Sequence, residues 1–485
     1  MHAASPALSP QFHEDRAMTG ATEPPSRLAK QLTLAAMSLG YGVVQLDVTI
    51  VNTALNSMGS ALGGGVSELQ WVVSTYTIAF AALILTAGAL GDRLGAKKIF
   101  MVGFSVFTAA SLACALAPTS AILIAARAAQ GVGAAILVPN SLALLNHAYP
   151  DAKERGRAVA MWAAGASLAL TAGPLVGGAL ITLVGWRSIF LVNLPIGLAG
   201  LWLTWRYATD TARTARELDL PGQATAIAAL GALAAAIIEG GRLGWSNAWV
   251  IAGFAAFVVF ATLFVVQERR AHVPMLPLSL FTHRMFALTS LLGLLVNIAV
   301  YGLLFVFSLY FQEINGLSPL MTGFAFVPMM AVVFPVNLLA PRLAERIGAR
   351  AVIAIGASIS AAGCVALLGI APGTSYWMIG PQLVAIGGGL GLLVPPMTST
   401  LLGSVEKSRS GIAAGVLNSA RQTGSALGVA LFGSFIGRSD TFLFGARAAL
   451  VVSAVLLICA AAAMAFGGRT SKMRRSASLF GDARA

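Results

Sequence analysis

The sequence predicts an all-α integral membrane protein, and three observations support this fold class. The chain of 485 residues is 57% hydrophobic and only 10% charged, with a mean hydropathy of +0.82. A soluble domain is nearer half apolar and a quarter charged. The apolar residues gather in stretches long enough to cross a bilayer, and most basic residues lie between those stretches.

Fourteen apolar stretches have the length of a transmembrane helix and are separated by polar, Gly or Pro breaks. We expect helices at 32–58, 69–91, 98–117, 120–147, 157–182, 188–206, 221–239, 248–267, 285–311, 320–340, 350–370, 376–402, 411–437 and 444–467. Residues 1–28 are polar and are predicted to form a disordered cytoplasmic tail, and 469–485 form a basic one. The first apolar stretch is too long for a signal-peptide core, so it should remain as a span.

The distribution of Lys and Arg predicts the orientation of the spans. With a cytoplasmic amino terminus, the inner segments hold about 25 basic residues and the outer loops hold only Arg187, Arg242, Arg438 and Arg447. This bias predicts a multi-pass protein of the cytoplasmic (inner) membrane with both termini in the cytoplasm. It also explains the net charge of +13 without a nucleic-acid partner.

An internal repeat divides the chain into two bundles. Ala87–Gly103 aligns without gaps with Ala340–Gly356, and Gly131–Asn140 aligns with Gly387–Pro396 at nearly the same offset. Transporters are commonly built from such repeats, with the substrate site between the halves. We therefore expect two pseudo-symmetric six-helix bundles, at 29–207 and 271–468, joined by two inserted linker helices within 208–270.

Five motifs occur in order along the first bundle. They are LDVTIVNTAL from Leu46, GALGDRLGAKK from Gly88, RAAQGVG from Arg127, GASLALTAGPLVGG from Gly165 and GWRSIFLVNLPIG from Gly185. Together with fourteen spans, they resemble the major facilitator superfamily, specifically its fourteen-helix drug:proton antiporters of the EmrB/QacA type. Asn56 stands where that family usually has proline, and Ala96 replaces a usual basic residue. The resemblance implies the major facilitator fold and transport driven by the proton gradient without a cofactor.

The first span has two different faces. At 100° per residue, Gln45, Thr49, Asn52 and Asn56 form a polar stripe suited to a water-filled cavity. Other side chains predicted to line the substrate cavity are Asn297, Tyr301, Phe305, Phe324 and Asn337. An aromatic and apolar lining would suit bulky lipophilic or cationic compounds, although aromatic residues in spans often only pack.

Asp47 lies roughly 200° from Gln45 on the same helix, on a face of small residues. A buried carboxylate needs a partner, and Arg127 is the only intramembrane cation of the N-terminal half, with Gln130 on the same face. A nearby guanidinium favours the ionised carboxylate, and separation of the helices in hydrocarbon favours its protonation. We therefore predict that Asp47, Arg127 and Gln130 couple transport to protons. The alternative is a static ion pair that only fixes helix packing.

The loop after the second span is predicted to form a conformational latch between the two halves. Its residues are Gly88, Asp92, Arg93, Gly95 and Lys97, and the repeat places Glu345 and Arg346 at the positions of Asp92 and Arg93. Gly95 would allow a tight turn into the third span. The alternative is an ordinary charged cytoplasmic loop.

The fifth span carries the motif that the family resemblance associates with exporters. Its residues Gly165, Gly173, Pro174, Gly177 and Gly178 recur at near-helical spacing. Small residues permit close helix contact, and an intramembrane proline bends a helix. The physical prediction is a bendable, leak-tight seam.

Three charged residues have uncertain roles. Arg421 has no obvious acidic partner in its half and could reach the cytoplasmic end of its span by snorkelling. Glu239 and Glu313 lie at predicted outer helix ends, where charges cost little.

The leading functional prediction is a proton-coupled exporter of drugs or lipophilic or cationic small molecules, working by alternating access. The alternatives are an importer, uniporter or lipid transporter of the same fold. A membrane enzyme or sensor is disfavoured because the sequence has no P-loop, HExxH or GxSxG motif. The three cysteines have no metal-binding spacing, so no metal site is predicted. The expected partners are protons, a small-molecule substrate and the bilayer, and a periplasmic adaptor is not indicated.

Overall fold

The computed structural model describes residues 26–213, 218–406, 409–437 and 441–466, and this part of the chain is helical without strands. The first bundle contains α1 (Arg27–Leu62), α2 (Val66–Leu94), α3 (Ala96–Leu116), α4 (Ser120–Ala148), α5 (Ala152–Val184), α6 (Ser188–Leu191) and α7 (Asn193–Tyr207). The linker pair is α8 (Leu220–Leu243) and α9 (Ala248–Arg270).

The second bundle follows a short 3-10 turn, η1 (Leu278–Thr282). It contains α10 (Arg284–Leu309), which continues into the π-helical turn η2 (Tyr310–Ile314), then α11 (Pro319–Ile347), α12 (Ala349–Ala366) with the 3-10 turn η3 (Leu367–Gly369), α13 (Tyr376–Leu402), α14 (Ser410–Ile436) and α15 (Phe442–Phe466). The prediction of an all-helical membrane protein is confirmed.

Thirteen helical segments of the described chain are long and apolar enough to cross a membrane, and α14 is the remaining predicted span. With 27 residues α14 is long enough. Its polar residues, among them Asn418, Arg421 and Gln422, lower its hydropathy. They are tolerated because α14 packs against α2, α8, α10 and α15 rather than lying free in lipid.

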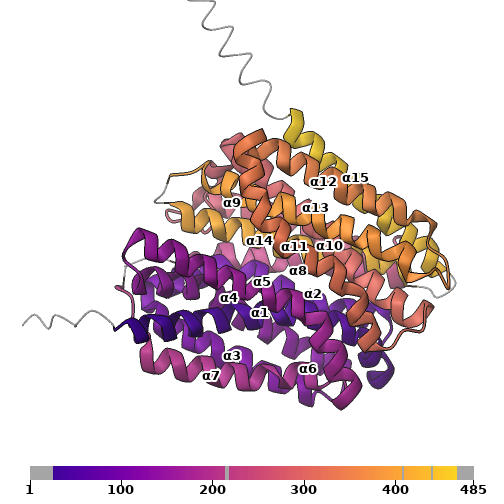
Figure 1. Ribbon diagram of the computed structural model, residues 1–485, viewed down its shortest axis with the longest axis horizontal. Coiled ribbons are helices and arrows are strands. Elements are labelled where there is room, and N and C mark those ends of the chain that lie inside the picture. Colours follow the sequence, from indigo (N-terminus) through magenta and orange to yellow (C-terminus); the bar gives the residue numbers. More distant parts are fainter. Residues whose placement is uncertain (1–25, 214–217, 407–408, 438–440, 467–485) are drawn as a thin grey trace, which may run out of the picture.

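The two bundles lie side by side, the first in indigo and purple and the second in orange and yellow (Figure 1). They meet along two helix pairs, α2 with α14 and α5 with α11. Polar side chains of α2 and α14 bridge the first pair: Gln70 Nε2 donates to the carbonyl of Val429 at 3.1 Å, and Ser419 Oγ donates to that of Ala81 at 2.7 Å. A central space between α1, α5, α10 and α11 is thereby framed on both sides.

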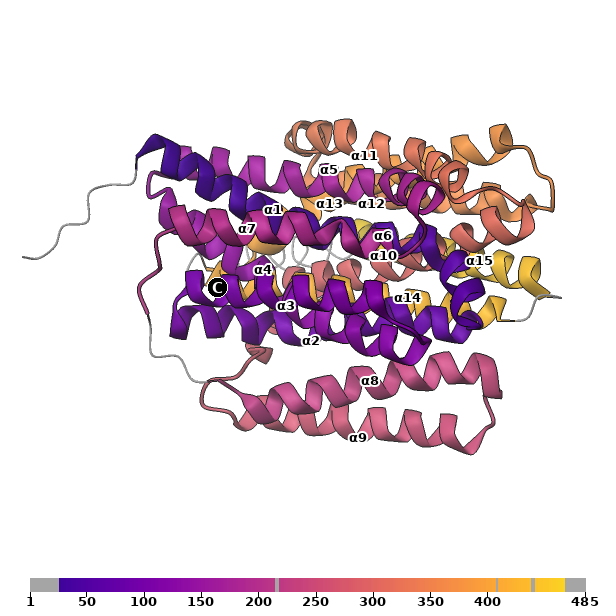
Figure 2. The same ribbon diagram turned by 90° about the horizontal axis from the view of Figure 1, so that it is seen from below.

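The linker helices α8 and α9 form a pair on one flank of the molecule (Figure 2). α8 packs on α2 and α14, while α9 has only Val250 and Glu268 buried. The amide of Gln223 anchors α8, because its Nε2 donates to the Ala82 carbonyl at 3.0 Å and its Oε1 accepts from Thr86. The pair therefore covers the α2–α14 junction and leaves α9 facing lipid.

Two tight turns make the internal repeat visible in the backbone. Gly95, between α2 and α3, has φ +97°, and Gly348, at the equivalent place between α11 and α12, has φ +88°. Only glycine adopts such angles without strain, so the turn predicted at Gly95 is present in both halves.

The helix boundaries differ from the predicted ones mainly at their ends. α1 begins at Arg27, inside the predicted tail, because the Ser26 hydroxyl accepts the amide of Ala29 and caps the helix. The sixth span is broken into α6 and α7 at Val192. The rest of the predicted amino-terminal tail and the basic tail 469–485 lie outside the described residues.

Candidate functional site

An ion pair joins α1 and α4 inside the first bundle. Arg127 Nη1 lies 2.5 Å from Asp47 Oδ2, and the two side chains are 1% and 0% exposed. Gln130 completes the contact, because its Nε2 donates to Asp47 Oδ1 at 2.8 Å and its Oε1 accepts from Arg127 Nη1 at 2.7 Å. The structure thus brings together the three residues for which proton coupling was predicted.

Two further polar residues, which the sequence reasoning missed, extend this network. Ser111 on α3 accepts from Gln130 Nε2 at 2.9 Å, and Asn193 at the start of α7 donates to Asp47 Oδ1 at 3.3 Å. Asn193 lies in the motif that begins at Gly185, so a polar residue in an apolar motif was an available signal. Ser111 gave none, since serine is common in spans. Four side chains from α3, α4 and α7 therefore surround the Asp47 carboxylate on α1.

The guanidinium of Arg127 is held by more than the ion pair. Its Nε donates to the Val72 carbonyl at 3.1 Å, and its Cζ lies 4.3 Å from the ring centroid of Tyr76. A buried guanidinium remains charged, so Asp47 is the member of the pair that can accept a proton.

A cavity of about 280 Å³ lies between the two bundles, on the opposite face of α1 from Asp47. It is lined from the first bundle by Tyr41, Gln45, Thr49, Trp162, Ala163, Ala166, Ser167, Leu170 and Thr171, and from the second by Val296, Asn297, Val300, Tyr301, Leu304, Met329, Met330, Val333, Phe334, Asn337, Leu390, Val394 and Arg421. The structure thus places five of the predicted cavity residues there: Gln45, Thr49, Asn297, Tyr301 and Asn337.

Four of the predicted cavity residues, Asn52, Asn56, Phe305 and Phe324, do not line this cavity in the conformation described. Asn52 is buried within the helix contacts, and Asn56 lies one turn further out. The polar stripe from Gln45 to Asn56 is about 16 Å long, and the cavity ends before its outer half. Phe305 is fully buried in the hydrophobic core for the same reason, one turn beyond Tyr301. Helical periodicity predicted the face of the helix on which these side chains lie. Their position along the helix, beyond the end of the cavity, determines that they are buried instead.

Phe324 and the three uncertain charges have distinct places. Phe324 is half exposed on α11 and does not line the cavity in this conformation. Arg421 does not reach the helix end: it lies eleven residues after Ser410, about 16 Å along α14, and lines the cavity. Glu239 pairs with Arg242 at 2.6 Å and accepts from Trp71 Nε1 at 3.3 Å, so it ties α8 to α2. Glu313 is exposed in η2.

The end of the molecule opposite the chain termini is closed by contacts between α1 and α10. Ser308 Oγ donates to the Asn52 carbonyl, and Gln312 Nε2 donates to the Thr53 carbonyl at 3.2 Å. In α1 the cavity residues precede this contact and lie nearer Arg27, where the chain enters the bundle. The cavity therefore lies on the terminal side of these contacts, which we call the outer seal because they lie at the end away from the termini.

The predicted exporter glycines form part of the same seal. A Cβ at Gly173 would lie 2.0 Å from Thr49 Oγ1, and one at Gly178 would lie 2.5 Å from the Pro319 carbonyl oxygen. Gly177 meets Thr53 and Ile50 of α1 in the same way, whereas Gly165 has only an ordinary 3.7 Å contact with Ser38. α5 therefore packs closely on both α1 and α11.

Gly323 of α11, which the sequence reasoning missed, makes an equivalent close contact with the backbone of α5. A Cβ there would lie 2.4 Å from the carbonyl oxygen of Pro174, the proline at the centre of the glycine motif. The backbone of α11 thus packs against a glycine of α5, and the backbone of α5 packs against a glycine of α11. We call each of these glycine positions a glycine notch. This close approach explains why the seam between α5 and α11 requires small residues.

We expect Gly178→Ala to open this seam. The added methyl group must displace the Pro319 backbone in the sealed state only, and overpacking of this kind costs about 1–3 kcal/mol. The sealed population should therefore fall about 5- to 150-fold relative to the outward-open one. The measurement is the rate at which an impermeant maleimide labels Val300→Cys, a cavity position, from outside intact cells.

The matched control is Gly165→Ala on the same helix, which has room for the methyl group and should leave labelling unchanged. Both variants need a background in which the three native cysteines are replaced. Equal labelling in Gly178→Ala and Gly165→Ala would show that the glycine notch does not control the seal.

The predicted latch residues fall in two different environments. Gly88 and Asp92 line a cavity of about 220 Å³ between α2, α4 and α14, at the boundary between the bundles. Gly95 is buried, and a Cβ there would meet the carboxylate of Asp210. Arg93, Glu345 and Arg346 are exposed, and Lys97 is partly buried. The pairing of the two loops into a latch stays a prediction.

The loop from α2 to α3 is fixed from the segment that follows α7. Asp210 Oδ1 accepts the backbone amide of Lys97 at 3.0 Å, and Thr211 Oγ1 accepts that of Ala96 at 3.0 Å. Lys97 Nζ also donates to the Trp205 carbonyl at 3.0 Å. These contacts cap the amino end of α3, and they gave no signal in the sequence because Asp210 lies 113 residues away.

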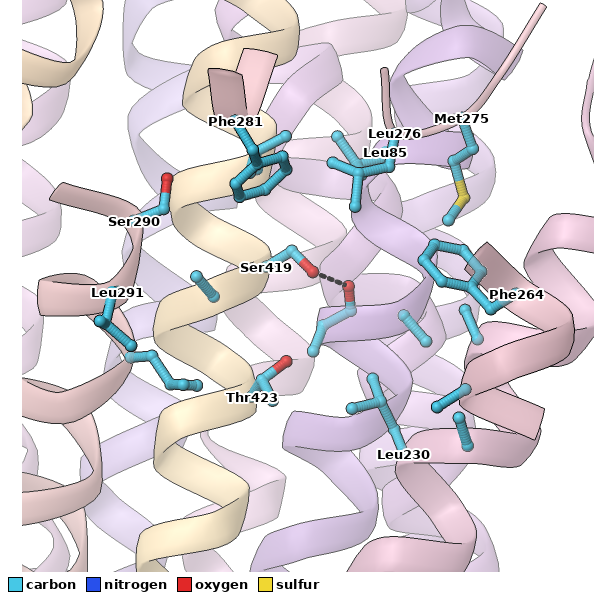
Figure 3. Close-up of a pocket in the computed structure, with 18 of the residues that line it drawn as sticks. Leu85, Leu230, Phe264, Met275, Leu276, Phe281, Ser290, Leu291, Ser419 and Thr423 are labelled. Atoms are coloured by element: carbon cyan, nitrogen blue, oxygen red, sulfur yellow. Dashed lines mark hydrogen bonds between the residues drawn. The ribbon is translucent and has the colours of Figure 1, made fainter. Parts of the chain in front are cut away.

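A second and more apolar cavity, of about 500 Å³, lies between α2, α8, α9, α10 and α14. Its wall includes Leu85, Leu230, Phe264 and Phe281, and its polar atoms are hydroxyls such as that of Ser419, which is engaged with the Ala81 carbonyl (Figure 3). No charged side chain lines it. It has no lining residue in common with the central cavity and cannot orient a polar group strongly.

No group of three or more His, Cys, Asp or Glu side chains suited to a metal ion occurs within the described residues.

Comparison with known proteins identifies the family. The model of the Major Facilitator Superfamily matches residues 37–429. The methylenomycin A resistance protein of Streptomyces coelicolor is 36% identical over 414 residues, which are 85% of this chain and 87% of that protein. The multidrug resistance protein Stp of Mycobacterium tuberculosis is 39% identical over 406 residues, 84% of this chain and 75% of that one.

Among solved structures, the D-xylose-proton symporter superposes with a TM-score of 0.65 at 12% sequence identity, covering 90% of this chain and 97% of the other. This likeness shows the fold alone. The family is one of multi-pass membrane transporters, not enzymes, so the expectation that the protein is not an enzyme is confirmed. The chain therefore belongs to the Major Facilitator Superfamily, and its resemblance to the fourteen-helix drug exporters of that superfamily is confirmed.

Proposed function

We propose that the protein is a proton-coupled antiporter that exports drug-like small molecules from the cytoplasm. The observation that carries this proposal is the separation of two sites on one helix. On one face of α1, Asp47 forms the buried network with Arg127 and Gln130. On the opposite face, Gln45 and Thr49 line the central cavity. A change at either site must move or repack the same helix.

The geometry supports a cycle of alternating access. With Asp47 ionised, the ion pair holds α1 against α4. Protonation removes the carboxylate charge, so the attraction to Arg127 is lost and α1 is released from α4. α1 also packs against the glycines Gly173 and Gly177 of α5, which itself meets α11 at the outer seal. A shift of α1 is therefore transmitted to the seal between the bundles.

Export of drugs is supported by the relatives named for resistance to methylenomycin A and to multiple drugs. A membrane transporter confers resistance most directly by lowering the internal drug concentration. In the proposed inner-membrane orientation, with both termini cytoplasmic, the cavity lies on the cytoplasmic side of the closed seal. Substrate would enter from the cytoplasm or the inner leaflet, and protons would enter from outside.

The test is proton-linked dye uptake into inside-out vesicles that contain the protein. In an antiporter a proton gradient that is acid inside these vesicles drives uptake, because protons leave the lumen as substrate enters. Dissipation of the gradient with an ionophore abolishes this uptake. Substrate entry should also release protons measurably. Uptake that is indifferent to the gradient would indicate a uniporter, and uptake opposed by it would indicate an importer. Either result would overturn the proposal.

A further inference from the structure

Arg421 is the one charged side chain that lines the central cavity. It stands near the middle of α14, and its Cγ passes within 3.4 Å of where a Cβ at Gly293 of α10 would be. Because Gly293 has no side chain, there is room for the Arg421 side chain to extend between α10 and α14. Arginine retains its proton in proteins, so the cavity carries a permanent positive charge.

Among the described residues, no carboxylate forms an ion pair with this guanidinium. Within residues 26–213, 218–406, 409–437 and 441–466, the ion pairs leave Arg421 without an acidic partner, and Asp and Glu are absent from the cavity lining. Asp47 is turned away from the cavity and is already held by Arg127, Gln130 and Asn193. Within the described residues, the intramembrane arginine of the first bundle thus has an acidic partner, whereas Arg421 of the second bundle has none.

Neutral hydrogen-bond donors surround the same space. The hydroxyls of Tyr41 and Tyr301 and the amide of Gln45 line the cavity, and Arg421 is close enough to both tyrosines to interact with them electrostatically. The lining also includes Thr49, Ser167, Thr171, Asn297 and Asn337. The rest of the wall is apolar and aromatic, including Trp162, which stacks on Tyr41 with 4.3 Å between the ring centroids. One cation, several neutral donors and an apolar wall together form a site for an amphiphilic anion.

We propose that the transported substrates are lipophilic small molecules that carry a carboxylate or a similar oxyanion, which Arg421 binds. This inference rests on the proposed export function and names its substrate class. A cationic compound would be repelled by an uncompensated guanidinium in a cavity of low dielectric constant. The expectation of cationic substrates, based on the apolar lining alone, is thereby replaced. A volume of about 280 Å³ suits a small organic acid rather than a two-chain lipid.

The test is binding of three probes with one carbon skeleton to the purified full-length protein. The probes are 4-phenylbutyrate, its neutral amide 4-phenylbutyramide and the cation 4-phenylbutylamine, and the measurement is isothermal titration calorimetry. We expect wild type to bind the carboxylate at least tenfold more tightly than the amine, with the amide between them. Arg421→Gln should remove the difference in affinity between the three probes. Arg421→Lys should keep part of it, because lysine retains the positive charge but lacks the planar guanidinium group that binds a carboxylate through two hydrogen bonds.

Arg447→Gln is the matched control, since Arg447 also lies within a span but bonds the Ile370 carbonyl at 2.9 Å and does not line the cavity. It should keep the wild-type order of affinities. The proposal is overturned if wild type binds the amine as tightly as the carboxylate, if it binds none of the probes, or if the preference survives in Arg421→Gln. Calorimetry needs no proton gradient, so intact anion preference without proton-linked uptake would contradict the export function alone.

Discussion

Asp47→Asn should abolish proton-driven accumulation of substrate in inside-out vesicles. The asparagine retains a group that can hydrogen-bond Gln130 and Asn193, but it cannot bind and release a proton. A ligand that moves a two-state equilibrium from 1:99 to 99:1 must bind one state more favourably by about 5.5 kcal/mol, and here that ligand is the proton. Without it, gradient-driven uptake should fall to the level of vesicles that lack the protein.

Exchange of labelled for unlabelled substrate should continue in Asp47→Asn, because the cavity face of α1 is unchanged. The variant imitates the protonated state that the cycle visits, so we expect it to fold. Asp47→Glu restores a titratable carboxylate and should recover part of the proton-driven uptake. Glu239→Gln removes an acid that pairs with Arg242 on the linker helix, outside the network, and should keep full coupling. Undiminished proton-driven uptake in Asp47→Asn would assign the ion pair a packing role only.

The contact between α1 and α4 could be predicted from the sequence because few alternatives existed. The first bundle has one buried carboxylate and one intramembrane arginine, and burial of either alone is costly. Helical periodicity then separated the face of Asp47 from that of Gln45. The assignment of faces uses the periodicity of a single helix, and the ion pair follows from the presence of two opposite charges, so neither step needs knowledge of the tertiary packing.

The outer seal could not be predicted in the same way. Periodicity placed Asn52 in line with Gln45, but only the packing of α10 shows that Ser308 covers this part of α1. The glycines of α5 were recognisable, whereas Gly323 was not, because it enters the seam from the other half of the chain. Depth along a helix and contacts between distant segments depend on tertiary packing that a local pattern does not encode.

The position of Arg421 illustrates the same limit. From the sequence, snorkelling to the cytoplasmic end was a reasonable way to avoid the cost of burial. In the structure the cost of burial is avoided differently, because the Arg421 side chain extends past Gly293 into a cavity shared by both bundles. The charge is thus accommodated by a space between helices, which exists only once both halves are assembled.

Arg127→Ala should destabilise the protein strongly, because it leaves Asp47 buried without its counterion. Breaking a buried ion pair from one side costs about 3–5 kcal/mol, partly as the penalty of the charge that remains. The loss should appear as a lower midpoint of thermal unfolding in detergent, followed by size-exclusion chromatography. Arg447→Ala, which removes an arginine that donates to the Ile370 carbonyl, should cost less, about 1–3 kcal/mol.

The double variant Asp47→Asn with Arg127→Ala separates charge from packing. It leaves the same space beside Tyr76 as Arg127→Ala does, but no unpaired carboxylate, so it should be more stable than that single variant. Equal stability of the two would show that the lost packing, not the isolated charge, accounts for the damage. Stability and coupling are then separate properties of one pair. Under both hypotheses the double variant should be more stable than Arg127→Ala. A static ion pair predicts that Asp47→Asn keeps proton coupling, whereas a titrating pair predicts that Asp47→Asn loses it.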